Sequence, residues 1–325
     1  MIATRLSRLS NPTPQLTVHT ESIMPHRRDF LAGSLAAASL ASLPTNNLFA
    51  ADSETKSRWP ICVFTKPLNS MSFDEMAAAL AKAGFDGVEA TVRKSGNVEP
   101  ADAAEKLPEM QRAMQKHGLE ITLITTDIGS MDDPHRATVL ETAADLGVSR
   151  FRMRYGKYNR KQPIQHQLDH WKQQFGELAD YCGKIGMQAL YQNHAGENYL
   201  GASLWDLDRV LSDISPDHMG VVYDIRHAQV EGGMSWPVTW RMIQPRVRML
   251  YVKDFQWDDG RVTNVPLGDG LVSQKFFDAV KASDLDCPIS LHEEYLDHRD
   301  PKLVPQHLEA MTTDLKTLQK RLGVK

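Results

Sequence analysis

A short pattern recurs four times along this chain and limits the folds that it can adopt. In each copy a helical stretch ends, a glycine follows, and an apolar run that favours a β-strand comes next. The glycines are Gly84, Gly118, Gly147 and Gly186, and glycine at such a place can take the left-handed conformation that ends a helix. The steps between them are 34, 29 and 39 residues, the length of one strand and one helix. The pattern therefore predicts repeated strand–helix units.

Further elements are expected before and after these copies. Additional strands are predicted at 59–64, 219–224, 247–254 and 288–294, and helices at 72–83, 204–212, 236–242, 273–282 and 303–322. Ser72 and Glu75 have the spacing of a capping box at the start of a helix. Eight strands alternating with eight helices predict an α/β protein with the (β/α)8 architecture of a TIM barrel. A doubly wound sheet is the alternative, but it favours a glycine-rich turn after the first strand, and the sequence has no such turn.

The first 51 residues have the pattern of an export signal. The pair Arg27 and Arg28 precedes the uncharged run 31–43, and small residues follow it, as in signals of the twin-arginine (Tat) route. The run is shorter than the roughly 20 residues that span a bilayer. Met24 stands shortly before the arginine pair, so translation starts at Met1 or at Met24. We expect cleavage of this segment and export to the periplasm or another extracytoplasmic compartment, with no membrane association afterwards.

The remaining chain, residues 52–325, has the length of one large barrel domain. The full chain has a formal net charge of −4, and residues 1–50 hold four basic and two acidic residues, so their removal leaves about −6. This acidic balance argues against nucleic acid as a partner, because phosphate backbones bind basic surfaces. The three cysteines, Cys62, Cys182 and Cys287, are too widely spaced for a zinc motif or a disulfide framework. We expect them to be buried thiols.

Polar side chains gather where the expected strands end, which is where TIM barrels build their sites. The alternation of a strand turns them inward, and so many polar groups beside apolar strands are costly without partners or a ligand. They are Glu89, Arg152, Arg154, Gln192, His194, Asp224, Tyr251, Lys253, His292 and Glu294, with His227 three residues after Asp224. Structural alternatives stay open for several of them. Glu89 with Arg152 and Arg154 would form an ion-pair network, Lys253 a solvated strand end, and His194 a hydrogen-bonded loop residue.

Six motifs lie on or beside these strands. They are A-G-F-D-G-V-E at 83–89, Q-N-H at 192–194, D-I-R-H at 224–227, Y-V-K-D at 251–254, P-L-G-D-G at 266–270 and I-S-L-H-E-E at 289–294. As a set they resemble the xylose isomerase-like TIM barrels, a family of sugar isomerases and epimerases, over essentially all of 52–325. The family pattern at these places is G-F-D-G-V-E, E-N-H, D-x-x-H, H-x-K-D, L-G-x-G and a last strand that ends in Glu. Each motif alone is weak, and the set is fairly specific.

The resemblance implies a divalent metal, such as Mn, Mg or Zn. Family members hold it with Glu, Asp, His and Glu from the fifth to the eighth strand, and the two glutamates move a proton between neighbouring sugar carbons. This chain has Gln192 in place of the first Glu and Tyr251 in place of the His. An amide cannot accept a proton near neutral pH, and an un-ionised tyrosine is a poor ligand. The candidate ligands are Gln192, Asp224, His292 and Glu294, in a site that is either weakened or lost, and the role of the last strand stays open between His292, Glu293 and Glu294.

We therefore expect an enzyme that isomerises or epimerises a sugar, keto-sugar or polyol by proton transfer next to a carbonyl. The substrate is expected to be non-phosphorylated, because phosphosugars are cytoplasmic. Glu294 is the expected base and Lys253 or His194 the acid, and the expected substrate contacts are Glu89, Arg152, Arg154, His194, His227 and Tyr251. A lyase or hydratase with a single base and a non-catalytic sugar-binding protein are the alternatives. The expected partner is a small carbohydrate, and a homo-oligomer stays open.

Overall fold

The apolar runs form eight parallel strands that close into a barrel, which confirms the predicted (β/α)8 TIM barrel. The strands are β1 (Ile61–Phe64), β2 (Gly87–Val92), β3 (Glu120–Thr126), β4 (Arg150–Arg152), β5 (Gln188–Gln192), β6 (Met219–Asp224), β7 (Val247–Val252) and β10 (Ile289–Leu291). β1 pairs with both β2 and β10, and this closes the ring. The computed structural model describes residues 58–324, so the expected export signal, residues 1–51, lies outside the described part of the chain.

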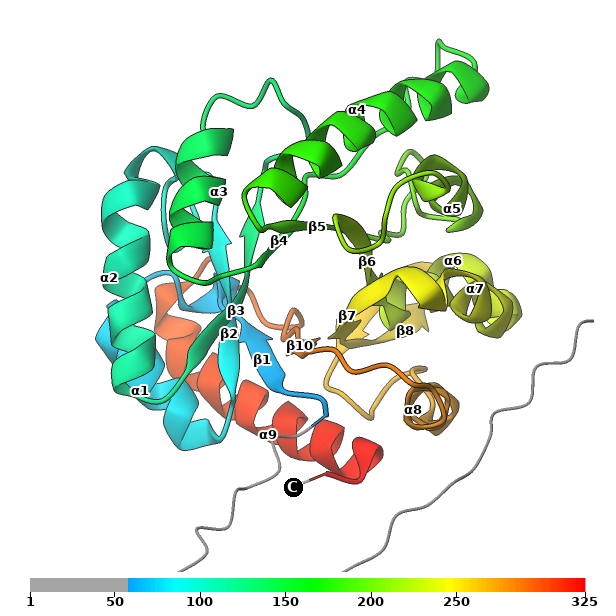
Figure 1. Ribbon diagram of the computed structural model, residues 1–325. Helices are drawn as coiled ribbons and strands as arrows, with labels where there is room; N and C mark the ends of the chain where they lie inside the picture. Colours follow the sequence, from blue (N-terminus) through cyan, green and yellow to red (C-terminus); the bar gives the residue numbers. More distant parts are fainter. Residues whose placement is uncertain (1–57, 325) are drawn as a thin grey trace, which may run out of the picture. The chain divides into compact units, whose positions relative to one another are not determined.

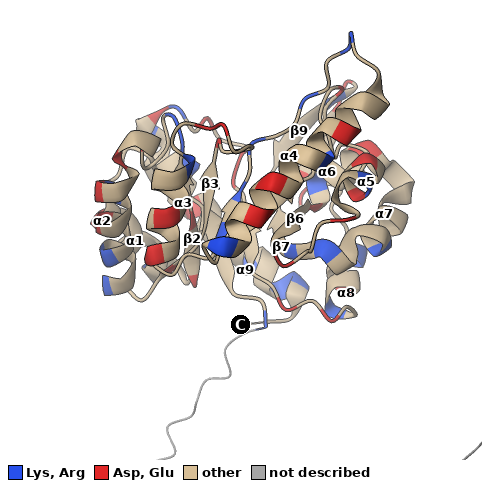
Figure 2. Cartoon of the chain, turned by 45° about the horizontal axis from the view of Figure 1, so that its top comes forward, with Lys and Arg blue, Asp and Glu red and all other residues tan. Residues whose placement is uncertain are grey.

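Helices surround the barrel (Figure 1). They are α1 (Phe73–Ala83), α2 (Ala103–Lys116), α3 (Arg136–Asp145), α4 (Ile164–Lys184), α5 (Trp205–Leu211), α6 (Ile225–Gly232), α7 (Trp236–Ile243), α8 (Gln274–Lys281) and α9 (Val304–Leu322), with short 3-10 helices η1 (Lys66–Leu68), η2 (Pro100–Asp102), η3 (Gly233–Ser235), η4 (Gln244–Arg246) and η5 (Pro301–Leu303). Acidic and basic residues are mixed along the outer helices, for example α2 and α4 (Figure 2). None of the helices between residues 58 and 324 has the length and apolar composition needed to cross a bilayer.

The local signals at the ends of helices are confirmed where the structure describes them. The Ser72 side chain accepts the backbone N–H of Glu75, and the Glu75 carboxylate accepts that of Ser72, both at 3.3 Å. This is the predicted capping box of α1. The four repeated glycines have φ values between 71° and 98°, in the left-handed region that favours glycine. Each helix can therefore stop abruptly before its strand begins.

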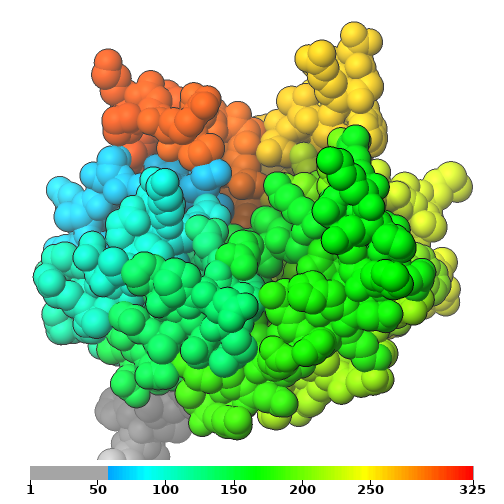
Figure 3. Space-filling view, turned by 90° about the horizontal axis from the view of Figure 1, so that it is seen from above, coloured from blue at the N-terminus to red at the C-terminus, as the bar shows by residue number. Residues whose placement is uncertain are grey.

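Two elements after the sixth strand differ from the prediction. A helix that was not predicted, α6, begins directly at Ile225, because the Asp224 carboxylate accepts the backbone N–H of His227 and caps the first turn. The expected strand 247–254 ends at Val252, and an antiparallel hairpin of β8 (Asp254–Asp258) and β9 (Arg261–Val265) follows it. The hairpin (yellow) and the segment after β10 (orange) project on either side of a notch (Figure 3).

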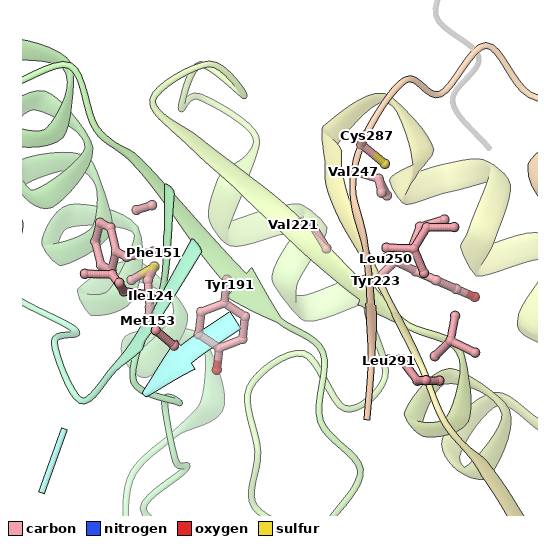
Figure 4. Packing of buried hydrophobic residues seen from close by; sticks show 14 of the residues in the cluster. Ile124, Phe151, Met153, Tyr191, Val221, Tyr223, Val247, Leu250, Cys287 and Leu291 are labelled. Carbon is pink, nitrogen blue, oxygen red and sulfur yellow. The ribbon is translucent and has the colours of Figure 1, made fainter. Parts of the chain in front are cut away.

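The core has two layers, as the alternation of side chains along the strands requires. A small cluster of Cys62, Leu123, Leu190, Val222, Met249 and Tyr251 fills the inside of the barrel. A larger cluster packs the outer face of the strands against the helices, and Figure 4 shows part of it, including the neighbours Ile124 and Phe151 and the neighbours Tyr223 and Leu250. The three cysteines are buried free thiols, as predicted.

Candidate active site

A cavity of about 400 Å³ opens where the barrel strands end. The carboxyl edge of a parallel barrel is the place where side chains from different strands converge. The structure brings eight of the predicted site residues to its wall, namely Glu89, Arg152, Gln192, His194, His227, Lys253, His292 and Glu294. Asp224 is buried in contact with this wall, at 3.3 Å from Lys253. Arg154 and Tyr251 do not line the cavity.

The ammonium group of Lys253 lies between two carboxylates. Its Nζ atom is 2.6 Å from Oε2 of Glu294 and 3.3 Å from Oδ2 of Asp224. Burial lowers the pKa of Lys253, but the charges of Asp224 and Glu294 outweigh it and raise this pKa above the ordinary value. Burial raises the pKa of Glu294, but Lys253 and then His292 outweigh it and lower this pKa. The cavity therefore holds a buried positive charge that stays protonated throughout the physiological pH range.

Gln192 and Asp224 are fixed by hydrogen bonds. The Gln192 amide donates its N–H to Oδ2 of Asp224 at 2.8 Å, and its oxygen accepts the hydroxyl of Tyr155 at 2.5 Å. Asn193 accepts the backbone N–H of Asp224 at 2.8 Å and donates to its carbonyl oxygen at 3.0 Å. These contacts hold the ends of β5 and β6 in register and orient the Asp224 carboxylate toward Lys253.

Glu89, Tyr251 and His292 belong to one buried hydrogen-bonded cluster. The Glu89 carboxylate is fully buried and is held by four side chains. It accepts hydroxyl groups from Thr125 at 2.5 Å, Tyr251 at 2.6 Å and Ser290 at 2.6 Å, and lies 2.9 Å from Nε2 of His292. Burial raises the pKa of Glu89, but His292 and the hydroxyl groups outweigh it and lower this pKa to about 2. All acceptor positions of the carboxylate are used, so this cluster forms the floor of the cavity and leaves Tyr251 no free hydroxyl for a substrate.

The two arginines predicted for the site, Arg152 and Arg154, lie apart. Arg152 ends β4, and its guanidinium donates to the carbonyl of Met153 at 3.1 Å and lies 4.7 Å from the ring centre of Tyr155. β4 ends at Arg152, so the inward alternation does not extend to Arg154. The half-exposed Arg154 instead pairs with Asp133 at 2.5 Å, outside the cavity.

His194 and His227 are in contact at the cavity wall, with ring centres 4.0 Å apart and ring planes tilted by 35°. Nδ1 of His194 is 2.8 Å from the carbonyl oxygen of Ala195, so this nitrogen carries the hydrogen and Nε2 is a free acceptor. Nδ1 of His227 accepts an N–H of Arg226 at 2.9 Å, so its Nε2 carries the hydrogen. Burial and the charge of Lys253 lower the pKa of His194 to about 4 and that of His227 well below its usual range. Both rings are therefore neutral at neutral pH, one with a free acceptor and the other with a free donor.

A family model described as the xylose isomerase-like TIM barrel matches residues 77–314, more than half of the chain. The chain belongs to this family. No curated protein sequence matches it significantly. The expected resemblance is thus confirmed for the barrel domain.

Several solved structures agree with this chain in fold. The IOLI protein with a bound zinc atom has a TM-score of 0.65 at 16% identity, covering 81% of this chain and 98% of that one. A 3-keto-D-glucoside 4-epimerase, YcjR, from E. coli has a TM-score of 0.63 at 14% identity, covering 81% and 99%. A xylose isomerase-like barrel protein from Mycobacterium smegmatis in complex with magnesium has a TM-score of 0.56 at 16% identity, covering 79% and 98%.

The donor set of this xylose isomerase-like barrel does not fit a divalent ion. Gln192 turns its N–H, rather than its oxygen, toward Asp224, and Tyr251 and His292 are engaged by Glu89. The space between Asp224 and Glu294 is occupied by the ammonium group of Lys253. A metal at the same place would meet a positive charge at close range. Among residues 58–324 no three His, Cys, Asp or Glu side chains are gathered as ligands.

Several cavity residues were not among those predicted, namely Phe64, Lys66, Arg93, Tyr155, Arg226, Asn264 and His298. Lys66 and Arg93 lie one or two residues beyond the ends of β1 and β2, so extending the strand-end rule by two residues would have found them. Asn264 belongs to the hairpin and His298 to the segment after β10. The sequence carries no comparable signal for these two.

Proposed function

We propose that this protein is a sugar isomerase or epimerase that moves a proton next to a carbonyl, with the Lys253 ammonium as the fixed cation of the site. The observation that carries the proposal is the position of Lys253 between Asp224 and Glu294 at the cavity wall. Proton removal next to a carbonyl places negative charge on the carbonyl oxygen. A fixed, desolvated cation beside that oxygen lowers the barrier. The epimerase from E. coli supports this reaction class as a relative of the same fold.

Glu294 is the proposed base. Its carboxylate takes the proton from the carbon next to the carbonyl, the electron pair forms the double bond of an enediolate, and Lys253 stabilises the oxygen. Return of this proton to the neighbouring carbon, together with transfer of the hydroxyl proton of the enediolate to the other oxygen as the new carbonyl forms, gives the isomer, and the mass is unchanged. The developing oxyanion competes with Glu294 for the ammonium group, and this raises the basicity of the carboxylate as the reaction proceeds.

The two neutral histidines have complementary roles in this scheme. Nε2 of His194 accepts a substrate hydroxyl, so His194 acts as an acceptor and not as the acid that the sequence left open. Nε2–H of His227 is buried and has no partner among the described residues; its distance of 3.5 Å from Asp224 is too long for a good hydrogen bond. A substrate oxygen would satisfy this donor. The pair therefore orients two neighbouring oxygens of a sugar.

A lyase or dehydratase is the second candidate, and the state of Glu89 and Gln192 favours it. Glu89 is saturated by its four partners, and Gln192 cannot accept a proton, so Glu294 is the carboxylate left for proton removal. One base is enough for elimination. Glu294 removes the proton next to the carbonyl, the C–O bond on the following carbon breaks, and Lys253 gives the departing hydroxide a proton to form water.

The test uses the full chain, purified without chelator and also after chelator treatment. Both preparations are incubated with a panel of aldoses, ketoses, keto-sugars, polyols and sugar acids, and products are separated by mass. Isomerisation conserves mass and elimination loses water. We expect turnover that survives chelation, falls about 10²–10³-fold in Lys253→Met and is unchanged in Lys281→Met, an exposed lysine paired with Asp278.

Three results would overturn the proposal or part of it. Turnover by Lys253→Met at the wild-type rate removes the role of the ammonium. About one metal per chain, lost together with activity in Asp224→Ala, replaces the proposed mechanism by a metal-assisted one. Binding of a sugar without turnover of any panel member leaves a sugar-binding protein. The non-phosphorylated substrate rests on the expected export, which N-terminal sequencing of the secreted protein tests.

A further inference from the structure

Two cations at the mouth of the cavity, Lys66 and Arg93, have neither an ion pair nor a hydrogen bond from their side chains among the described residues. Five lysine and arginine side chains line the cavity, and three of them are engaged: Arg152 with Met153, Arg226 with His227 and Lys253 with Glu294. For the side chains of Lys66 and Arg93, the described part of the chain provides neither a hydrogen bond nor an ion pair.

These two side chains lie at the junction of two cavities. Lys66 begins η1 after the first strand, and Arg93 directly follows β2. Both line the inner cavity of about 400 Å³ and also an outer cavity of about 670 Å³. The guanidinium of Arg93 lies 5.8 Å from the ring centre of Phe64, and this ring stacks on His292 at 4.5 Å. Lys66 and Arg93 are therefore shared by the two cavities, and Lys253 lines the inner one.

The electrostatics of the mouth favour an anion. Burial lowers the pKa of Arg93, and the charge of Arg152 lowers it further. Burial also lowers the pKa of Lys66, and Glu294 only partly offsets this effect because Arg93 and Lys253 repel the ammonium. Two half-buried cations that repel their neighbours raise the free energy of the empty site. A negative ligand group relieves that repulsion and gains charge-assisted hydrogen bonds.

We propose that Lys66 and Arg93 form a subsite for the carboxylate of a sugar acid, so that the substrate of the proposed enzyme is an aldonate or uronate rather than a neutral sugar. This inference rests on the proposed function for the chemistry at Lys253 and Glu294. It assigns the anion to two cations that are free to bind rather than to the predicted substrate contacts Arg152 and Arg154, which are engaged by Met153 and Asp133.

The charge balance favours a carboxylate over a phosphate. Asp127 also lines the outer cavity and raises the pKa of Arg93, without forming an ion pair with it. Arg299 at the same cavity is paired with Asp297 at 2.9 Å, and Lys94 is exposed and screened by water. Lys66 and Arg93 against Asp127 leave one positive charge without a partner. A carboxylate supplies one negative charge at neutral pH, whereas a phosphate monoester supplies nearly two.

The experiment measures binding and therefore does not depend on turnover. Isothermal titration of the full chain at pH 7.5 compares D-gluconate and D-glucuronate with D-glucose and with D-glucose 6-phosphate. We expect the acids to bind at least tenfold more tightly than glucose. Lys66→Gln and Arg93→Gln should each lower the affinity for the acids at least fivefold and leave glucose unchanged. Arg112→Gln, at an exposed position on α2 that lines neither cavity, is the matched control.

The outcomes separate the two proposals. Acids that bind with this selectivity but are not turned over support the subsite and refute the enzyme. Glucose binding as tightly as the acids, or selectivity that survives both variants, refutes the subsite. Tighter binding of the phosphate ester, lost in Arg93→Gln, refutes the carboxylate assignment. If Lys66→Gln or Arg93→Gln unfolds, the subsite is tested with the other variant and with Arg93→Lys, which keeps the charge. The measured quantity is then the ratio of the affinity for the acids to the affinity for glucose.

Discussion

Replacing Lys253 by methionine removes the ammonium group that lies between Asp224 and Glu294. The side chains of Lys253 and Asp224 are 7% and 0% exposed, and that of Glu294 is 27% exposed. At 2.6 Å and 3.3 Å the two attractions are about 6 and about 5 kcal/mol for an effective dielectric constant of about 20. Desolvation of the ions offsets much of this, but removal of one partner leaves buried charge uncompensated, which costs about 3–5 kcal/mol.

The expected result is a lower melting temperature with a defined pH dependence. A loss of about 3–5 kcal/mol corresponds to a decrease in Tm of about 6–12 °C for a domain of this size. In the wild type, the raised pKa of Lys253 gives stability that is complete below about pH 10 and is lost as pH rises through the folded pKa. The lowered pKa of Glu294 gives stability that is present above about pH 4.3 and is lost as pH falls through the folded pKa. In Lys253→Met the carboxylates of Asp224 and Glu294 repel each other, and protonation of one of them relieves this repulsion. The loss of stability relative to wild type is therefore expected to be smaller near pH 4.5 than near pH 7.5.

Circular dichroism melting of wild type and variant at pH 4.5, 6 and 7.5 measures both effects. Lys281→Met is the control, because its ion pair with Asp278 lies in solvent and its removal should leave Tm almost unchanged. The double variant Lys253→Met with Asp224→Asn removes one of the repelling charges and should recover part of the lost stability at neutral pH. A Lys253→Met protein that melts within 2 °C of wild type at pH 7.5 would refute the reasoning, as would a loss that is independent of pH.

Two further predictions concern the cavity. The pKa of His194 is lowered to about 4, so the ring gains a proton only near that pH. We therefore expect the acidic limb of the pH–kcat/KM profile near pH 4. An acidic limb near pH 6.5 in the wild type that disappears in His194→Asn would contradict this. Glu89→Gln places an amide N–H₂ among donors and is expected to cost about 3 kcal/mol in urea unfolding. The lowered pKa of Glu89 gives stability that is present above about pH 4.3 and is lost as pH falls toward about 2. The difference in unfolding free energy between wild type and Glu89→Gln should therefore shrink below pH 3. A difference that is independent of pH would count against a charged Glu89.

The strand ends show how far the sequence alone leads to the site. Alternation along the expected strands placed Gln192, at the end of β5, and Lys253, directly after β7, on the inner face, and the same rule identified eight of the fifteen residues of the cavity wall. The rule failed where its premise failed. Arg154 lies beyond the short strand β4, so its side chain no longer follows the alternation. Lys66 and Arg93, at the mouth of the cavity, lie one or two residues beyond β1 and β2. A search restricted to the last residues of each strand does not include them.

The sequence by itself determined the barrel and about half of the residues that line its cavity. Helix caps, the glycines that end helices and the periods of apolar residues are local, and they act over a few neighbours along the chain. The partner of each polar group was decided only by the tertiary structure. Lys253 meets Asp224 and Glu294, and Glu89 meets Tyr251 and His292, because barrel closure brings together strands that are far apart in sequence. The energies of ion pairs and hydrogen bonds depend on the distance between the two groups to within fractions of an ångström. These distances between groups on different strands are fixed only when the barrel closes.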